Sequence, residues 1–158
     1  MRIREYREED LPLLKELVFG LHEAVRPFDV YLPPAGAIID AYLAYLVERV
    51  KESSGTFFIA EGGGKAAGYL CLFGPVPVPT PDQHPEKYAL VSDVHVLPEH
   101  QGRGIGKALM DKAEDYARRK GAGRIELSVL SGNRRAIDFY RRLGYRERIK
   151  VYAKSLEE

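Results

Sequence analysis

Apolar side chains recur at helical spacing in two stretches near the start of the chain. The first stripe comprises Leu13, Leu14, Leu17, Val18 and Leu21, and the acidic residues 8–10 before it are typical of a helix N-terminus. The second stripe comprises Ile38, Ile39, Tyr42, Leu43, Leu46 and Val50. Prolines at positions 27, 33 and 34 separate the stripes. We therefore expect two amphipathic helices between residues 8 and 50.

Strand-like patterns follow these helices. Residues 56–61 are rich in aromatic and β-branched side chains, and the glycines at 62–64 predict a tight antiparallel connection to a strand over 66–73. Further strands are expected at residues 2–6, 88–97, 125–129 and 146–154. Helical patterns cover residues 104–120 and 133–143, and a glycine follows each.

The order of these elements predicts the fold class. One strand, two helices and three strands precede an alternation of helix and strand, without a repeat or linker. We expect one α/β domain over residues 1–158, built on a mixed sheet of about six or seven strands flanked by about four helices. The proline-rich segment 74–81 is expected outside the sheet, as an extended loop that either connects strands or forms a wall of a binding site.

Composition excludes several classes of protein. The 158 residues carry 24 Lys and Arg against 23 Asp and Glu, so the basic excess of a nucleic-acid binder is absent. No apolar run reaches the length of a membrane span or a signal peptide, and we expect a cytoplasmic location. Cys71 lies in an apolar run that favours a buried, inert thiol, and the four histidines show no metal-ligand spacing. We expect no metal, nucleic-acid or membrane partner.

The most informative segment lies between the strand ending near residue 97 and the helix beginning near 104. Glycines at alternate positions let a ligand approach the backbone, and successive N–H groups at a helix start favour an anion. Arg103 and Lys107 add positive charge beside them. These features suit a pyrophosphate. Ala108 stands where a nucleoside-triphosphate loop has a hydroxyl, and the glycine spacing of a dinucleotide fold is also absent.

Two segments resemble the acetyl-CoA-dependent N-acetyltransferases of the GNAT superfamily. Residues 101–106 follow the pattern Gln/Arg-x-x-Gly-x-Gly/Ala within the longer run 91–109, and residues 133–145 are similar to that family's next motif. The resemblance implies a GNAT-like fold with acetyl-CoA as cosubstrate. It implies that pyrophosphate binds the loop formed by Gln101, Gly102, Arg103, Gly104, Ile105 and Gly106, with Lys107 beside it. It also implies that pantetheine pairs with the backbone of Val94 and Val96.

The second motif carries two further candidates. Asn133 matches a residue that often contacts the cofactor, although a helix N-cap explains it equally well. Tyr140 matches a tyrosine that often serves as general acid toward the leaving thiolate, and aromatic packing is its other interpretation.

The acceptor amine needs help to become a nucleophile. Deprotonating an amine of pKa ~10.4 at pH 7 costs roughly 4.6 kcal/mol. Asp93 and His95 flank Val94 on one strand face and are the candidate bases, with Glu61 a weaker one. A surface pair or a hydrogen-bonded pair is the other interpretation of Asp93 and His95.

The sequence therefore predicts transfer of an acetyl group from acetyl-CoA to a primary amine by direct attack. The amine belongs to a small molecule or a peptide, and a homodimer is a possibility that the family resemblance raises. The alternative is a non-catalytic acyl-CoA-binding or regulatory domain on the same fold. The acceptor itself is not readable from any motif.

Overall fold

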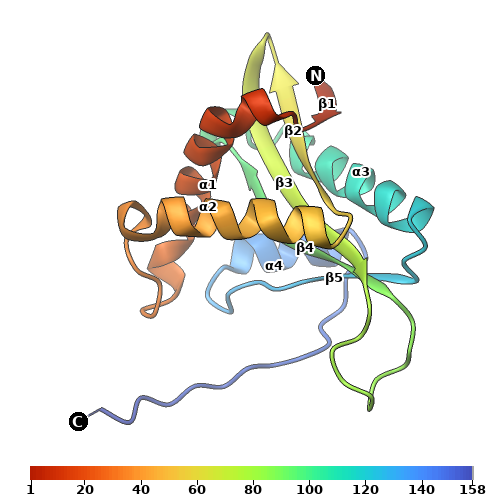
Figure 1. Ribbon diagram of the computed structural model, residues 1–158. Helices are drawn as coiled ribbons and strands as arrows, with labels where there is room; N and C mark the ends of the chain where they lie inside the picture. The colour runs from red at the N-terminus through yellow and green to blue at the C-terminus, as the bar shows by residue number, and fades with distance from the viewer. Residues whose placement is uncertain (158) are drawn as a thin grey trace.

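The computed structural model describes residues 1–157 and contains one five-stranded mixed sheet (Figure 1). The strands lie in sequence order and comprise β1 (Arg2–Glu5), β2 (Thr56–Gly62), β3 (Lys65–Val76), β4 (Tyr88–Val96) and β5 (Arg124–Leu127). All neighbours are antiparallel except β4 and β5, which are parallel. The antiparallel hairpin expected around the glycines at 62–64 is confirmed.

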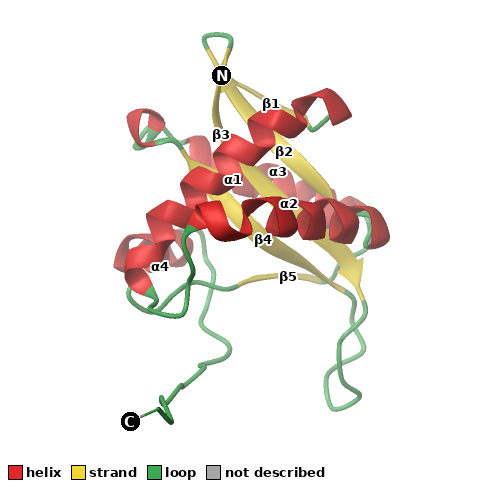
Figure 2. Ribbon diagram, turned by 60° about the vertical axis from the view of Figure 1, so that its left-hand side comes forward, coloured by secondary structure: helices red, strands yellow, loops and turns green. Residues whose placement is uncertain are grey.

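Helices cover both faces of this sheet, as the sequence predicted (Figure 2). They are α1 (Leu11–Val25), α2 (Ala35–Glu52), α3 (Ile105–Arg119) and α4 (Arg134–Arg142), with short 3-10 turns η1 (Glu8–Asp10), η2 (Arg26–Phe28) and η3 (Pro98–His100). α1 and α2 bury their apolar stripes against one face. α3 packs on the other, where Phe139, Tyr140 and Leu143 from the α4 region join its core. Cys71 is fully buried on the α1–α2 side, and burial raises the pKa of its thiol well above the usual value.

Two sequence predictions about strands were wrong. The sheet has five strands rather than six or seven, because residues 146–154 form no strand and instead run away from the body of the molecule (Figure 1). A strand needs a neighbour to satisfy its backbone, and among residues 1–157 no strand pairs with this segment. The segment 74–81 was expected wholly outside the sheet, but β3 continues through Val76, which pairs with Tyr88. Gly74 and Pro75 interrupt the register just before this pair. Residue 158 of the expected domain lies outside the described residues.

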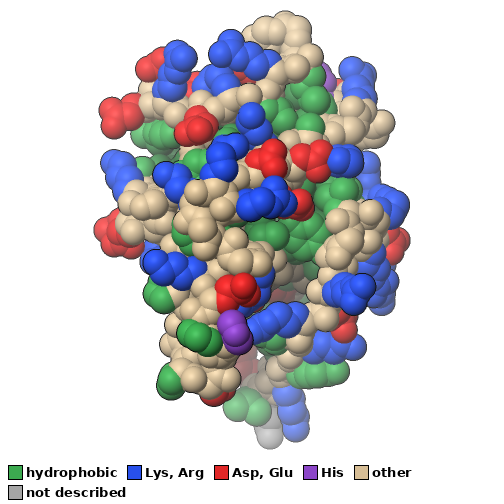
Figure 3. Space-filling model, turned by 90° about the vertical axis from the view of Figure 1, so that its right-hand side faces the viewer, with side chains coloured by type: hydrophobic (Ala, Val, Ile, Leu, Met, Phe, Trp, Pro, Cys, Tyr) green, Lys and Arg blue, Asp and Glu red, His purple; other side chains and the backbone are tan. Residues whose placement is uncertain are grey.

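The charged surface is mixed, in keeping with the near-zero net charge. Basic and acidic side chains both occur across the face shown in Figure 3. Within residues 1–157, no helix combines the length and the apolar character that crossing a bilayer requires.

A β-bulge of one residue in β4 changes which face of the sheet the following side chains lie on. Cys71 pairs with Asp93, whereas the next residue of β3, Leu72, pairs with Val91, so Ser92 is left over. Val91 packs into the core under α3, while Asp93 reaches α2 on the opposite face. Residues two apart share a face in a regular strand, and an extra residue breaks that rule. The bulge therefore turns Asp93 out of the α3 core.

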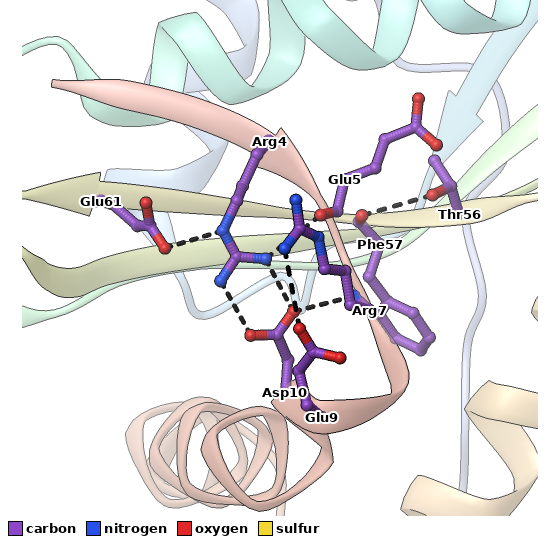
Figure 4. Close-up of polar contacts among 8 residues, drawn as sticks. All are labelled: Arg4, Glu5, Arg7, Glu9, Asp10, Thr56, Phe57 and Glu61. Atoms are coloured by element: carbon purple, nitrogen blue, oxygen red, sulfur yellow. Dashed lines mark hydrogen bonds and ion pairs between the residues drawn. The ribbon is translucent and has the colours of Figure 1, made fainter.

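A partly buried ion-pair network ties the first strand to the rest of the domain (Figure 4). The Arg4 guanidinium donates two hydrogen bonds to the Asp10 carboxylate (2.7 and 2.8 Å) and one to Glu61 of β2 (2.7 Å). Asp10 also accepts from the Arg7 backbone N–H (2.8 Å) and is only 8% exposed. The hydrogen bonds from Arg4 hold the pKa of Asp10 below its usual value. The network thus joins β1, β2 and the start of α1.

We predict that Arg4→Met lowers the free energy of unfolding by about 3 kcal/mol at neutral pH, because it leaves a buried carboxylate without its cation. A carboxylate with a depressed pKa contributes stability above its unfolded value, near ~3.9, and loses it as the pH falls through and below that value. The deficit should therefore shrink in acid. Denaturant unfolding at several pH values measures it.

The matched control is Arg7→Met, whose exposed side chain pairs with Glu9 at 3.6 Å. We expect it to cost less than about 0.5 kcal/mol. Equal losses in the two variants, or a loss for Arg4→Met that does not change with pH, would contradict the prediction.

Candidate active site

The two parallel strands separate after four residue pairs. β4 pairs with β5 from Tyr88 to Val91 and then continues to Val96, while β5 ends at Leu127 (Figure 2). The second half of β4 therefore has no strand on that side. Divergence of adjacent parallel strands opens a crevice where a ligand can reach the backbone.

The backbone of β4 faces this opening at the positions that the sequence singled out. The Leu97 N–H donates to the Ala67 carbonyl of β3 (2.9 Å). Successive residues of a strand direct their backbone groups to opposite sides, so Val94 and Val96 direct theirs away from β3. Nε2 of Gln101 donates to the Val96 carbonyl (2.9 Å) and occupies one of these groups. The Val94 groups lie on the open side.

A cavity of about 560 Å³ lies at this opening. Its walls come from α1, the segment before α2, α2 itself, the second half of β4, the segment after β5, and α4. Four predicted site residues line it: Asp93, Val94, Asn133 and Tyr140. His95, Val96 and the loop 101–107 lie outside its walls. The cavity thus brings together part of the predicted site and separates the two candidate bases.

Asp93 sits at the sheet face of this cavity, held by three hydroxyl groups. It accepts hydrogen bonds from Tyr42 Oη of α2 (2.8 Å), Tyr69 Oη of β3 (2.9 Å) and Ser92 Oγ (3.1 Å). Only 5% of Asp93 is exposed. Burial raises the pKa of Asp93 above its usual value, and the three donors oppose that rise because they stabilise the carboxylate.

His95 lies on the same face but under α1. A Cβ added at Gly20 would stand 3.3 Å from His95 Nε2, so the absence of a side chain at Gly20 gives the imidazole its space. Burial lowers the pKa of His95, which keeps the ring neutral at pH 7. No direct hydrogen bond joins His95 to Asp93 among the described residues, so the structure does not form the pair that was one interpretation of the sequence.

Tyr140 packs against aromatic neighbours and also lines the cavity. Its ring packs against Phe139 (5.2 Å between centroids) and edge-on to Tyr145 (5.9 Å), and its side chain also lines the cavity. Burial, with a further contribution from the Asp93 charge, raises the pKa of Tyr140 to about 12. The phenol is therefore protonated throughout the neutral range and is a hydrogen-bond donor.

The glycine loop forms a turn of free backbone donors. Gly102 and Gly104 adopt left-handed φ angles of 75° and 79°, which other residues adopt only with strain, and Gly104 is the N-cap of α3. Within the described chain, the N–H groups of residues 102–107 have no backbone acceptor. The start of α3 thus presents several amides and the positive end of its dipole to solvent.

The third glycine of the loop, Gly106, is needed for close packing rather than for a left-handed backbone. A Cβ at Gly106 would lie 3.2 Å from the Phe139 ring and 3.8 Å from Val96. Gly106 therefore lets α3 approach α4 and β4 closely. Exposed Lys107 forms an ion pair with Asp111 one turn along α3 (2.6 Å), so its charge is shared with that carboxylate.

Asn133 caps α4, as one interpretation of the sequence required. Its Oδ1 accepts a hydrogen bond from the Ala136 N–H (3.2 Å). Because Asn133 also lines the cavity, capping and ligand contact are compatible.

Sequence reasoning missed Tyr69 as a site residue. Its hydroxyl is the lone polar group within a run of apolar side chains, and a fully buried phenol needs an acceptor. That requirement could have identified Tyr69 from the sequence. The bulge that turns Asp93 toward Tyr69 has no recognisable pattern in the sequence.

A mixed sheet with diverging central strands, a cavity at the divergence and a glycine loop at the start of the next helix define an acetyltransferase-type architecture. Residues 21–145 match the acetyltransferase (GNAT) family, and the chain belongs to that family.

Relatives and solved structures agree with this assignment. An uncharacterised N-acetyltransferase of Methanocaldococcus jannaschii is 33% identical over 92% of this chain, and the match spans 61% of that relative's length. A Bacillus halodurans protein of known structure superposes with a TM-score of 0.79 at 24% identity, covering 99% of this chain and 100% of its own. An aminoglycoside N-acetyltransferase solved with CoA has a TM-score of 0.69 at 18% identity, covering 98% and 99%. These two structures establish the shared fold.

We predict that Tyr42→Phe destabilises the protein more at pH 7 than at pH 4. Loss of one donor raises the pKa of Asp93 further, and a carboxyl with a raised pKa loses its stabilising effect as the pH rises through that value. The expected difference is about 1.5–3 kcal/mol, the range of a hydrogen bond to a charged group. Unfolding at the two pH values tests it.

Tyr45→Phe is the matched control, since Tyr45 stacks on Tyr42 (6.1 Å between centroids) but is half exposed and lies outside the Asp93 hydrogen bonds. A Tyr42→Phe deficit that is the same at both pH values would mean that the hydroxyl does not stabilise the charged form of Asp93.

Proposed function

We propose that this protein transfers an acetyl group from acetyl-CoA to a primary amine. The observation that carries the proposal is the cavity in which the open side of β4, the Asp93 carboxylate and the Tyr140 phenol meet. Family membership supports the transferase class, and the solved relative with CoA supports the donor. Acetyl-CoA supplies a thioester whose acetyl carbon accepts the amine and whose thiol leaves.

The chain's own groups suit the two ends of that donor. The free amides of residues 102–106 and the dipole of α3 would bind the pyrophosphate, with Arg103 and Lys107 adding charge. The backbone groups of Val94 and the N–H of Val96 would bind the pantetheine amides in the manner of an added strand, while the Val96 carbonyl is engaged by Gln101. Asn133 would contact the same arm from the start of α4.

Asp93 is the better placed of the two candidate bases because it lines the cavity and His95 does not. Its carboxylate would bind the ammonium form of the acceptor and accept the proton that attack requires. A raised pKa brings a carboxyl closer to the range in which a general base works at neutral pH. His95 supports this part of β4 from beneath α1.

Tyr140 would donate to the departing sulfur. A phenol with a pKa of about 12 retains its proton before the reaction and places a hydrogen bond where negative charge develops.

We predict that Tyr140→Phe lowers kcat by roughly 100-fold, the range of a lost general acid, and changes the affinity for acetyl-CoA by less than about twofold. The measurement combines a thermal-shift titration with acetyl-CoA and a free-thiol assay over a panel of primary amines. ATP in place of acetyl-CoA should give no stabilisation, since the loop lacks the features of a triphosphate site.

Tyr145→Phe is the control, because it removes a hydroxyl bonded to Glu114 (2.9 Å) on α3 and keeps the ring that packs on Tyr140. It should retain kcat. Full activity of Tyr140→Phe would return Tyr140 to a packing role. Stabilisation by acetyl-CoA without turnover of any amine would favour the non-catalytic acyl-CoA-binding alternative, and no stabilisation would overturn the donor assignment.

A further inference from the structure

The cavity has a chemically distinct half on its helical side. Six apolar residues from α1, α2 and the segment between them form this wall: Val18, Leu21, Val25, Leu32, Pro33 and Ile38. Among the described residues that line the cavity, none is Lys or Arg, and Asp93 is the one carboxylate.

His22 also lies on this wall. Its Nε2 lies 2.8 Å from the Pro33 carbonyl, a contact in which the ring donates its N–H. His22 therefore ties the segment before α2 to α1 and shapes the wall. Asp93 is the carboxylate that an acceptor meets inside the cavity.

We infer that the acceptor is a monoamine carried on an apolar body. This inference rests on the proposed function and names its substrate class. A carboxylate on the acceptor would be desolvated among aliphatic side chains without a Lys or Arg to pair with and would also be repelled by Asp93. A second ammonium would lack a second carboxylate in the cavity. An aliphatic or aromatic body is favoured there, because its apolar surface is removed from water.

The test uses three amines with one carbon skeleton: hexylamine, ω-aminohexanoate and hexane-diamine. With acetyl-CoA as donor, we expect kcat/KM for hexylamine to exceed that for each charged analogue by at least about tenfold. Binding of the three amines in the presence of CoA is measured separately by calorimetry, so that affinity is read without turnover.

The two readouts separate the failures. Turnover that is equal for hexylamine and either charged analogue overturns the inference and leaves the transferase intact. Selective binding of hexylamine without turnover contradicts the proposed acetyl transfer and supports the inference about the cavity. Absence of hexylamine binding overturns the inference.

A matched pair of variants locates the selectivity. Ile38→Arg places a cation on the apolar wall and should invert the preference between hexylamine and ω-aminohexanoate. Ala37→Arg adds the same side chain to an exposed neighbour outside the cavity and should leave the preference unchanged. An unchanged preference in Ile38→Arg would overturn the assignment of this wall.

Discussion

The site depends on one extra residue in β4. Ser92 breaks the alternation of the strand, so that Val91 contributes to the core under α3 while Asp93 turns to the hydroxyls of Tyr42 and Tyr69. Immediately beyond the same point, β5 ends and the backbone of Val94 is left open. A buried carboxylate and an unpaired strand edge are each unfavourable alone. Here three hydroxyls stabilise the carboxylate, and the adjoining cavity leaves the Val94 backbone groups open to a ligand.

Much of the fold was readable from local patterns. The apolar stripes of α1 and α2, the glycines between β2 and β3, and the cap at Asn133 each specify an element through contacts close in sequence. The glycine loop was readable for the same reason, since the left-handed backbone of Gly104 and the free amides beside it are local properties.

Features that depend on distant partners were not readable. The strand expected at residues 146–154 has a suitable pattern, but a pattern does not supply a neighbour. Gly106 resembled the other loop glycines in sequence, although a glycine is needed there because the Phe139 ring lies close to it. Asp93 and His95 were placed correctly on one face, yet only the packing of α1 and α2 showed that Asp93 alone lines the cavity.

The two halves of the cavity come from different parts of the chain. The apolar wall belongs to residues before position 39, and the groups assigned to the donor lie between 91 and 140. Under the proposed function, substitutions in the first segment would alter which molecule is modified without changing the groups assigned to the donor. Such a division lets selectivity diverge among descendants of one ancestor while the chemistry is preserved. It also marks residues 18–38 as the segment to exchange when a new acceptor is wanted.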